Sequence, residues 1–317
     1  MAKKLYIIGN GFDLAHKLGS SYYDFHDWLN GTNYVQDNPS DDGNFLSIID
    51  EILVFAGDKK YDSWRDFENA LGEIDVESYL NSIASQYDPD IEEMGDLADY
   101  VYSNVDIFSA QLGLGNVRER FAEWARTIPV YNDCTPVYED NIDKNGLFLT
   151  FNYTDTLEKV YHINPNNILH VHGSASKAGS PIIVGHKKTY DANKLKEWEK
   201  KVFGKDAGIA TLIVRALNSL RKDTKTIISK HKKWFDDLQV SGIEEVHLYG
   251  LSFGEVDDEY YKKIHEVLPN AKWIFAVYKP KRYGVKNISA FIKRIGIDKS
   301  LCSAFDQDTL DKNEVAL

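Results

Sequence analysis

The sequence has 317 residues, of which 43% are hydrophobic and 27% are charged, and its formal net charge is −12 at pH 7. These proportions are ordinary for a globular protein, and the chain is long enough to bury a substantial core. The negative charge argues against a general coat for nucleic acid, because phosphate binding needs a cationic surface. The two cysteines, Cys134 and Cys302, lie far apart without a C-x-x-C spacing, so the sequence predicts neither a zinc site nor a disulfide framework.

Neither a targeting segment nor a membrane segment is expected. The first residues, MAKKLYIIGNG, contain too short an apolar run for a signal peptide. No stretch approaches the roughly 20 apolar residues that span a bilayer. We therefore expect a cytoplasmic protein that does not contact a membrane.

Six short apolar segments, rich in β-branched and aromatic residues, are predicted as strands. They are residues 4–9, 147–153, 168–173, 181–185, 246–253 and 272–278. Near-continuous apolar runs are typical of strands that are buried on both faces. Most of them are followed by loops and helix-compatible segments, so the sequence predicts an α/β fold with a doubly wound, mostly parallel sheet.

Two long regions between the predicted strands have apolar residues at helical spacing. We expect one α/β domain over residues 1–317, with helical insertions at about 44–130 and about 187–240 that form a cap. The second insertion is rich in lysine, and its basic run 219–234 is interpreted as a solvated helix face, with partner or nucleic-acid contact as the alternative. Glu68 is interpreted as part of a solvated face, with a place beside the site as the alternative.

The first predicted strand ends in Gly9-Asn10-Gly11, followed by Phe12 and Asp13. Glycines at this point leave backbone N–H groups uncovered, and the start of the following helix favours a phosphate. The alternative is a tight strand-to-helix turn without a ligand. Asp13 is interpreted as a helix cap, with a hydrogen bond to a ribose as the alternative.

The second predicted strand ends at Asn152, at the edge where open α/β sheets bind their ligands. A buried asparagine is costly unless its amide is paired, so a ligand is a plausible partner. Asp155 and Glu158 resemble a capping box at the start of the next helix.

The third predicted strand carries His170 and His172, which alternation places on the same face, before Gly173. Zinc is disfavoured because no third ligand with suitable spacing is present. One of the two histidines can instead serve as a general base, the other being a core residue.

A similar design recurs further along the chain. Gly250, Ser252 and Gly254 follow the predicted strand at 246–253, and Asp257 opens the next helix. The segment lacks G-x-S-x-G, so it does not predict a hydrolase nucleophile; Ser252 and Asp257 are interpreted as lining or capping residues.

Taken together, these motifs resemble the AbiH-type family of bacteriophage abortive-infection proteins. The resemblance covers residue 5 to about residue 260, and its motifs, in chain order, are IGNGFDLAHKL, YYDF, WRDFE, FNYTDTLE, HVHG and GLSFGEVD. It implies a role in defence against phage, with a phage or host protein as the trigger.

The sequence is also distantly similar to sirtuin-like NAD-binding domains, through the Gly-x-Gly turn, the Asp24-Phe25 pair, Asn152 and His172-Gly173. This likeness implies NAD as the ligand or substrate and no metal, with Asn152 and His172 as the catalytic pair. Absence of the zinc-binding cysteines argues against a deacetylase. The implied cofactor-binding residues are Gly9, Asn10, Gly11, Phe12, Asp13, Asp24, Gly173, Gly250 and Ser252.

The expected function is therefore phage defence through a sirtuin-like cleft that binds NAD or a related nucleotide and hydrolyses its nicotinamide–ribose bond. The Gly9–Gly11 turn would hold the pyrophosphate. The alternatives are a non-catalytic nucleotide sensor or interaction module, and a metal-dependent nuclease that uses Asp13, Asp155 and Asp257.

Overall fold

The computed structural model describes residues 3–31, 42–57, 63–89, 96–112, 116–279, 285–307 and 315. The chain divides into two compact units. A sheet unit comprises Met1–Ser21, Ala125–Ile183 and Asp223–Leu317, and a helical unit comprises Tyr22–Trp124 and Val184–Lys222. Each unit is described by itself below.

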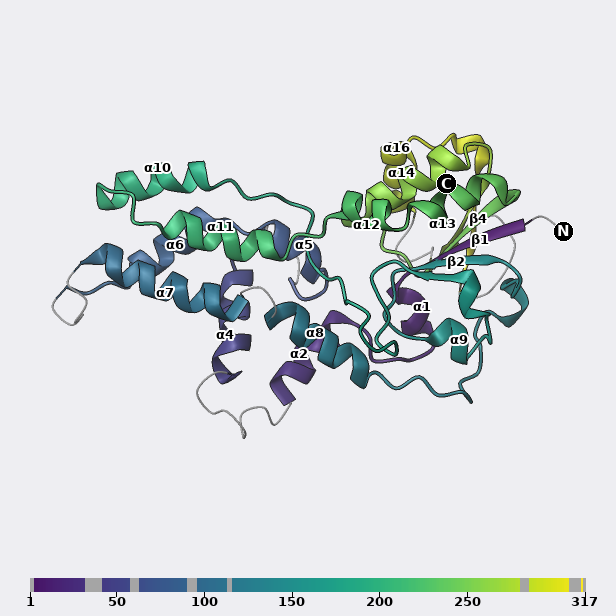
Figure 1. Ribbon diagram of the computed structural model, residues 1–317, viewed down its shortest axis with the longest axis horizontal. Coiled ribbons are helices and arrows are strands. Elements are labelled where there is room, and N and C mark those ends of the chain that lie inside the picture. Colours follow the sequence, from purple (N-terminus) through teal and green to yellow (C-terminus); the bar gives the residue numbers. More distant parts are fainter. Residues whose placement is uncertain are drawn as a thin grey trace. The chain divides into compact units, whose positions relative to one another are not determined.

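The sheet unit is built on one six-stranded sheet in the order β3-β2-β1-β4-β5-β6 (Figure 1). Every pair of neighbouring strands runs parallel. This confirms the predicted α/β class with a doubly wound sheet. The strands of the described residues are β1 (Lys3–Ile8), β2 (Leu147–Thr150), β3 (Ile168–His170), β4 (Ile243–Tyr249), β5 (Lys272–Val277) and β6 (Cys302–Asp306).

Strand β1 lies in the middle of this sheet. Strands β2 and β3 follow on one side of it and β4, β5 and β6 on the other, so the strand order reverses between β1 and β4. Open parallel sheets bind ligands outside the carboxyl ends of the strands at such a reversal. The ends of β1 and β4 are therefore the place where the fold favours a site.

Side chains alternate along β1, which divides the core between the two faces of the sheet. Leu5 and Ile7 join the core cluster of one face, and Tyr6 and Ile8 join that of the other. Helices cover both faces, as Figure 1 shows for the sheet unit. The first face carries α12 (Thr224–Lys230), α13 (Lys232–Val240), α14 (Asp258–Val267) and α16 (Lys286–Ile295), and the second carries α1 (Asn10–Ala15) and α9 (Thr156–Lys159).

The strand predicted at 181–185 is wrong, because this segment pairs with no strand of the described residues. Its hydrogen bonds are single contacts, among them two with the turn after β3 and the segment after β2. The Ile183 N–H donates to the His172 carbonyl (2.9 Å), and the Tyr153 hydroxyl donates to the Ile183 carbonyl (2.9 Å).

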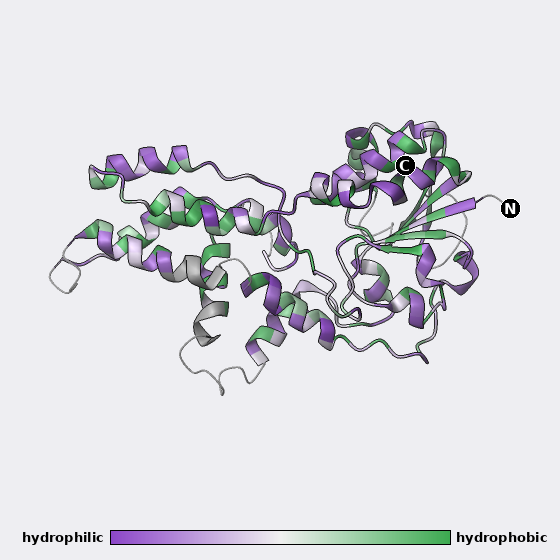
Figure 2. Cartoon of the chain, viewed as in Figure 1, coloured by the Kyte–Doolittle hydropathy of each residue, from purple (hydrophilic) through white to green (hydrophobic). Residues whose placement is uncertain are grey.

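The helical unit is held together by buried aromatic and aliphatic side chains of its helices, and Figure 2 shows that these helices carry both hydrophobic and hydrophilic residues. Phe25 contacts the rings of Phe67, Phe121 and Trp124 at 5.1–6.3 Å. The helices with described residues here are α2 (Tyr22–Gly31), α4 (Asp42–Leu53), α5 (Phe67–Gly72), α6 (Val76–Ala84), α7 (Leu97–Leu112), α8 (Asn116–Thr127), α10 (Ala192–Phe203) and α11 (Ile209–Ser219).

Glu68 of α5 binds two other residues within the helical unit and is not the solvated residue that we expected. Its Oε1 accepts a hydrogen bond from the Gly185 N–H (2.8 Å), and its carboxylate pairs with the Lys222 ammonium (2.8 Å). Lys222 is 2% exposed, so one end of the basic run 219–234 is buried.

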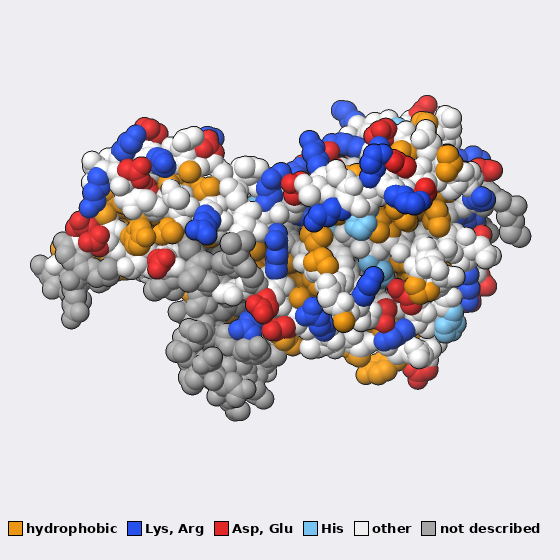
Figure 3. Space-filling model, in the orientation of Figure 1, with side chains coloured by type: hydrophobic (Ala, Val, Ile, Leu, Met, Phe, Trp, Pro, Cys, Tyr) orange, Lys and Arg blue, Asp and Glu red, His pale blue; other side chains and the backbone are white. Residues whose placement is uncertain are grey.

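The rest of that run belongs to α12 and α13 of the sheet unit. Lys232 and Lys233 pair with Asp236 and Asp237, four residues further on, as expected for a solvated helix face. Basic and acidic side chains are interleaved over the visible face of the molecule (Figure 3).

Candidate functional site

The turn after β1 packs directly on the backbone after β4. The Gly9 N–H donates to the Tyr249 carbonyl (2.9 Å) and the Gly11 N–H donates to the Gly250 carbonyl (2.8 Å). A Cβ at Gly11 would lie 2.8 Å from the Gly250 Cα, and Gly250 itself has φ of +64°. The glycines therefore permit this close contact, and the expectation of uncovered N–H groups at Gly9 and Gly11 is wrong.

Asn10 and Phe12 have structural partners within the sheet unit. The Asn10 amide donates to the Ser20 carbonyl (2.9 Å) and accepts from the Ser20 hydroxyl (2.7 Å). Phe12 is fully buried and packs on the rings of Tyr138 and Tyr161 at 5.3 Å. Both residues fix the strand-to-helix turn.

Asp13 is a buried anchor instead of the predicted helix cap. It is 1% exposed and accepts hydrogen bonds from the hydroxyls of Thr154 (2.6 Å) and Thr156 (2.8 Å), so it joins α1 to the start of α9. Gly9 takes the cap position of α1. Burial raises the pKa of Asp13 to about 6, although the hydrogen bonds from Thr154, Thr156 and Asn152 and the nearby His170 act in the opposite direction.

Asn152 lies just beyond the carboxyl end of β2 and is 6% exposed. Its side-chain Nδ2 donates to the Gly9 carbonyl (3.1 Å), which brings the ends of β1 and β2 together. Its Oδ1 is buried and has no hydrogen-bond donor among the residues that the structure describes. Asn152 is thus held by the hydrogen bond to Gly9, while its buried Oδ1 has no donor among the described residues.

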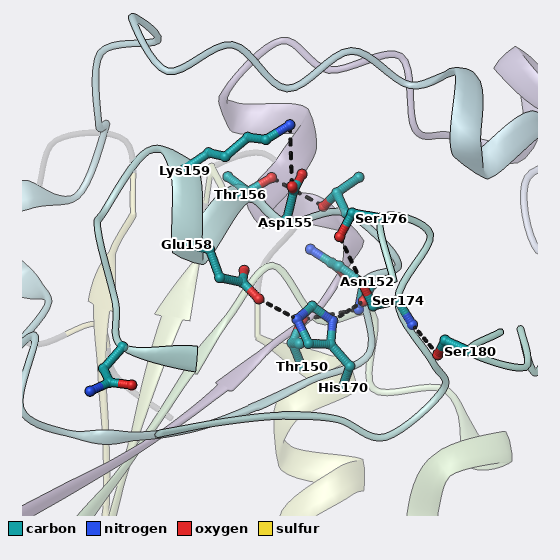
Figure 4. A network of polar contacts seen from close by, with 12 residues as sticks. Thr150, Asn152, Asp155, Thr156, Glu158, Lys159, His170, Ser174, Ser176 and Ser180 are labelled. Carbon is teal, nitrogen blue, oxygen red and sulfur yellow. Dashed lines mark hydrogen bonds and ion pairs between the residues drawn. The ribbon is translucent and has the colours of Figure 1, made fainter. Parts of the chain in front are cut away.

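His170 and Glu158 form a pair at the same edge, from the end of β3 and from α9 (Figure 4). The His170 Nε2 lies 2.8 Å from Glu158 Oε1, and the His170 Nδ1 lies 3.3 Å from the Asn152 carbonyl oxygen. Glu158 Oε2 is buried and, within the described part of the chain, without a donor.

The predicted capping box at Asp155 and Glu158 is wrong. Asp155 does take the position before α9, but it makes no side-chain cap and pairs with Lys159 (3.2 Å). Glu158 turns toward His170, not back to the helix start.

His172 lies on the other face of the sheet from His170, so the predicted shared face is wrong. Strand β3 ends at His170, and the turn that follows changes the direction of the next side chains. His172 is 2% exposed, packs on the rings of Phe151 (5.2 Å) and Tyr260 (5.6 Å), and has its Nε2 3.5 Å from Asp257 Oδ1.

Gly173 and the serines after it form a tight loop beside Asn152 (Figure 4). Gly173 has φ of +92°, and a Cβ there would lie 2.0 Å from the Pro181 carbonyl oxygen, so a glycine is needed. Ser174 and Ser176 have their hydroxyls 3.0 Å apart, and both can donate or accept.

Ser252 is exposed in the loop after β4, and Asp24 lies on α2 in the helical unit. The structure therefore brings most of the predicted residues to the carboxyl edge of one sheet, whereas Asp24 belongs to a different unit. Sequence reasoning missed Glu158 and Thr154 as parts of this edge; both lie within the FNYTDTLE motif, which is the signal that could have found them.

Three carboxylates considered for a nuclease have separate partners: Asp13 binds threonines, Asp155 binds Lys159 and Asp257 lies beside His172. Among the described residues, no group of three or more His, Cys, Asp or Glu side chains could hold a metal ion. No helix within the described ranges is long and apolar enough to cross a membrane.

The sheet order and the polar groups at its carboxyl edge define a doubly wound α/β protein with a candidate ligand site where β1, β2 and β3 end. The chain belongs to the AbiH family: residues 5–277 match the family described as bacteriophage abortive infection AbiH. This places it among proteins of abortive infection, a defence against phage. No curated protein and no solved structure matches the chain.

Proposed function

We propose that this AbiH-family chain acts in phage defence by binding NAD or a related nucleotide at the carboxyl edge of its sheet and hydrolysing the nicotinamide–ribose bond. One observation carries the proposal. Asn152 is buried where β1 and β2 end, and its amide oxygen has no donor within the described residues. An acceptor of this kind is suited to a water or to a ribose hydroxyl.

The reaction needs a water and a group that takes its proton. Water attacks the anomeric carbon, the bond from that carbon to the pyridinium nitrogen breaks, and its electron pair leaves with neutral nicotinamide. In the proposal, Asn152 orients the water and the ribose, and His172 takes the proton. Asp257, 3.5 Å from the His172 Nε2, would orient the ring and stabilise its charged form.

The test is NAD loss and nicotinamide release by the purified chain. Because a positioned general base contributes about 10²–10⁴-fold, we expect His172→Ala to lower the turnover of the folded protein by that factor. His26→Ala is the matched control, since His26 also lies beside a carboxylate (3.4 Å from Asp27) but on α2 of the helical unit. Equal turnover of wild type and His172→Ala would remove His172 from the mechanism.

A non-catalytic nucleotide sensor is the second candidate, favoured by the 2% exposure of His172 behind Phe151 and Tyr260. It predicts that NAD raises the melting temperature of the chain without release of nicotinamide. Product formation by wild type would exclude it.

A further inference from the structure

The edge around His170 contains two buried oxygen acceptors, Asn152 Oδ1 and Glu158 Oε2, that have no donor among the residues described. Each belongs to a residue that is otherwise firmly held. Asn152 donates to the Gly9 carbonyl, and the other Glu158 oxygen lies 2.8 Å from His170 Nε2. Figure 4 shows both residues beside the same imidazole ring. Buried polar atoms are nearly always paired with protein or with water, so two open acceptors on residues that flank one ring can accept hydrogen bonds from a ligand.

The surrounding groups do not suit an anion. Lys159, the cation on α9 nearest in sequence, is engaged by Asp155 (3.2 Å) and by the Val130 carbonyl (3.3 Å). The N–H groups of Gly9 and Gly11 are bonded to carbonyls of the chain. A phosphate at this place would therefore face oxygen acceptors instead of donors, and its negative charge would be repelled by them.

A metal ion is also poorly matched. The Nδ1 of His170 faces the Asn152 carbonyl oxygen, which can only accept, so that nitrogen carries a hydrogen. The Nε2 is engaged by Glu158. Both ring nitrogens are therefore engaged by oxygen atoms of the chain.

We propose that Asn152, Glu158 and His170 form a subsite for the vicinal hydroxyl groups of the ribose that carries nicotinamide in NAD, which is the terminal ribose of ADP-ribose. This rests on the proposed function and assigns the sugar of the nucleotide, not its pyrophosphate, to this corner of the edge. A vicinal diol supplies two hydroxyl donors close together, and a carboxylate accepts from a hydroxyl more strongly than a neutral group does. His170 acts as a positioning residue that holds the Glu158 carboxylate in place.

The test is the affinity of the whole chain for ADP-ribose and for ADP, which lacks the terminal ribose, measured by titration calorimetry. We expect wild type to bind ADP-ribose at least about tenfold more tightly than ADP, since a hydrogen bond to a charged group accounts for such a factor. Glu158→Gln replaces one carboxylate oxygen by an NH₂ donor, so it should remove this preference while leaving ADP affinity unchanged. Asp155→Asn, three residues earlier, is the control and should keep the preference.

Each possible result either supports or overturns the inference. Equal affinity of wild type for both ligands, or no binding of ADP-ribose, would overturn the inference without the need for any variant. Tight NAD binding that Glu158→Gln leaves unchanged would overturn the inference and keep the proposed function. A Glu158-dependent preference for ADP-ribose without any hydrolysis of NAD would support the inference and contradict the proposed hydrolase.

Discussion

Asp13 shows how a single buried carboxyl group can hold the candidate site together. It accepts hydrogen bonds from the hydroxyls of Thr154 and Thr156, so α1 is fixed to the segment that follows β2 and carries Asn152. The cost is that the carboxylate must lose its hydration, which is why burial raises its pKa to about 6. The geometry of the edge is therefore linked to pH.

The pH dependence of stability follows from the sign of this shift. Because the folded chain binds a proton at Asp13 more tightly than the unfolded chain, stability should fall as pH rises from about 4 to about 6. The Asp13 contribution to this fall is on the order of 2–3 kcal/mol. Asp13→Asn should flatten the curve of unfolding free energy, measured by urea titration at each pH. Identical slopes for the two proteins would contradict this explanation.

Gly11 tests the close contact between the turn after β1 and the loop after β4. An alanine there would place its Cβ 2.8 Å from the Gly250 Cα and 3.0 Å from the Gly250 carbonyl oxygen. We expect Gly11→Ala to lower the free energy of unfolding by about 1–3 kcal/mol, because backbone must move to relieve the overlap. Gly31→Ala is the control, since no described atom would lie within 4 Å of its Cβ. Equal stability of the two variants would show that the contact is not tight.

At the scale of elements, the loop after β4 is held in a strained conformation by a helix from the end of the chain. Phe253 has φ of +60°, which is unfavourable for a bulky residue. Its carbonyl accepts from Arg294 of α16 (2.8 Å), and its ring packs against Phe275 and Phe291. Strain of this kind persists only where the surroundings enforce it, and here they fix the loop that carries Ser252.

The same arginine pairs with Asp258 through two hydrogen bonds (2.7 and 3.0 Å), and Asp258 is 5% exposed. Arg294→Met would leave this buried carboxylate alone, so we expect a loss of about 1.5–3 kcal/mol in unfolding free energy. Lys263→Met is the control: its exposure is similar (24% against 26%), but its partner Glu266 is 69% exposed.

For that surface pair we expect a loss below about 0.5 kcal/mol. The two losses are compared by urea denaturation at pH 7. Similar values for Arg294→Met and Lys263→Met would mean that Arg294 does not restrain the loop.

At the scale of the whole molecule, the sheet could be predicted because its central strands are apolar on both faces. Strands β1 and β4 have fully buried carboxyl halves, and their sequences contain the clearest apolar runs. The edge strand β6 was missed since CSAFD is only half-buried and therefore lacks such a run. The segment 181–185 has the right composition but is irregular and pairs with no strand of the described residues, because composition does not determine hydrogen-bond partners.

The candidate site could be predicted only in part. Asn152 follows from its place after a strand, because the fold collects strand ends at one edge. The His170–Glu158 pair could not be foreseen, since it depends on β3 ending at His170 and on Asp155 taking Lys159 as its partner. Whether a residue caps a helix or binds across the sheet depends on such tertiary contacts.

The proposed nucleotide site lies where β1, β2 and β3 end, with the sugar at Asn152. A crystal structure of the chain grown with ADP-ribose tests it most directly. We expect ligand density at this edge, with a ribose hydroxyl within hydrogen-bonding distance of Asn152 Oδ1 or Glu158 Oε2. Density for the ligand elsewhere on the sheet unit, or for its phosphates at these two oxygens, would contradict it.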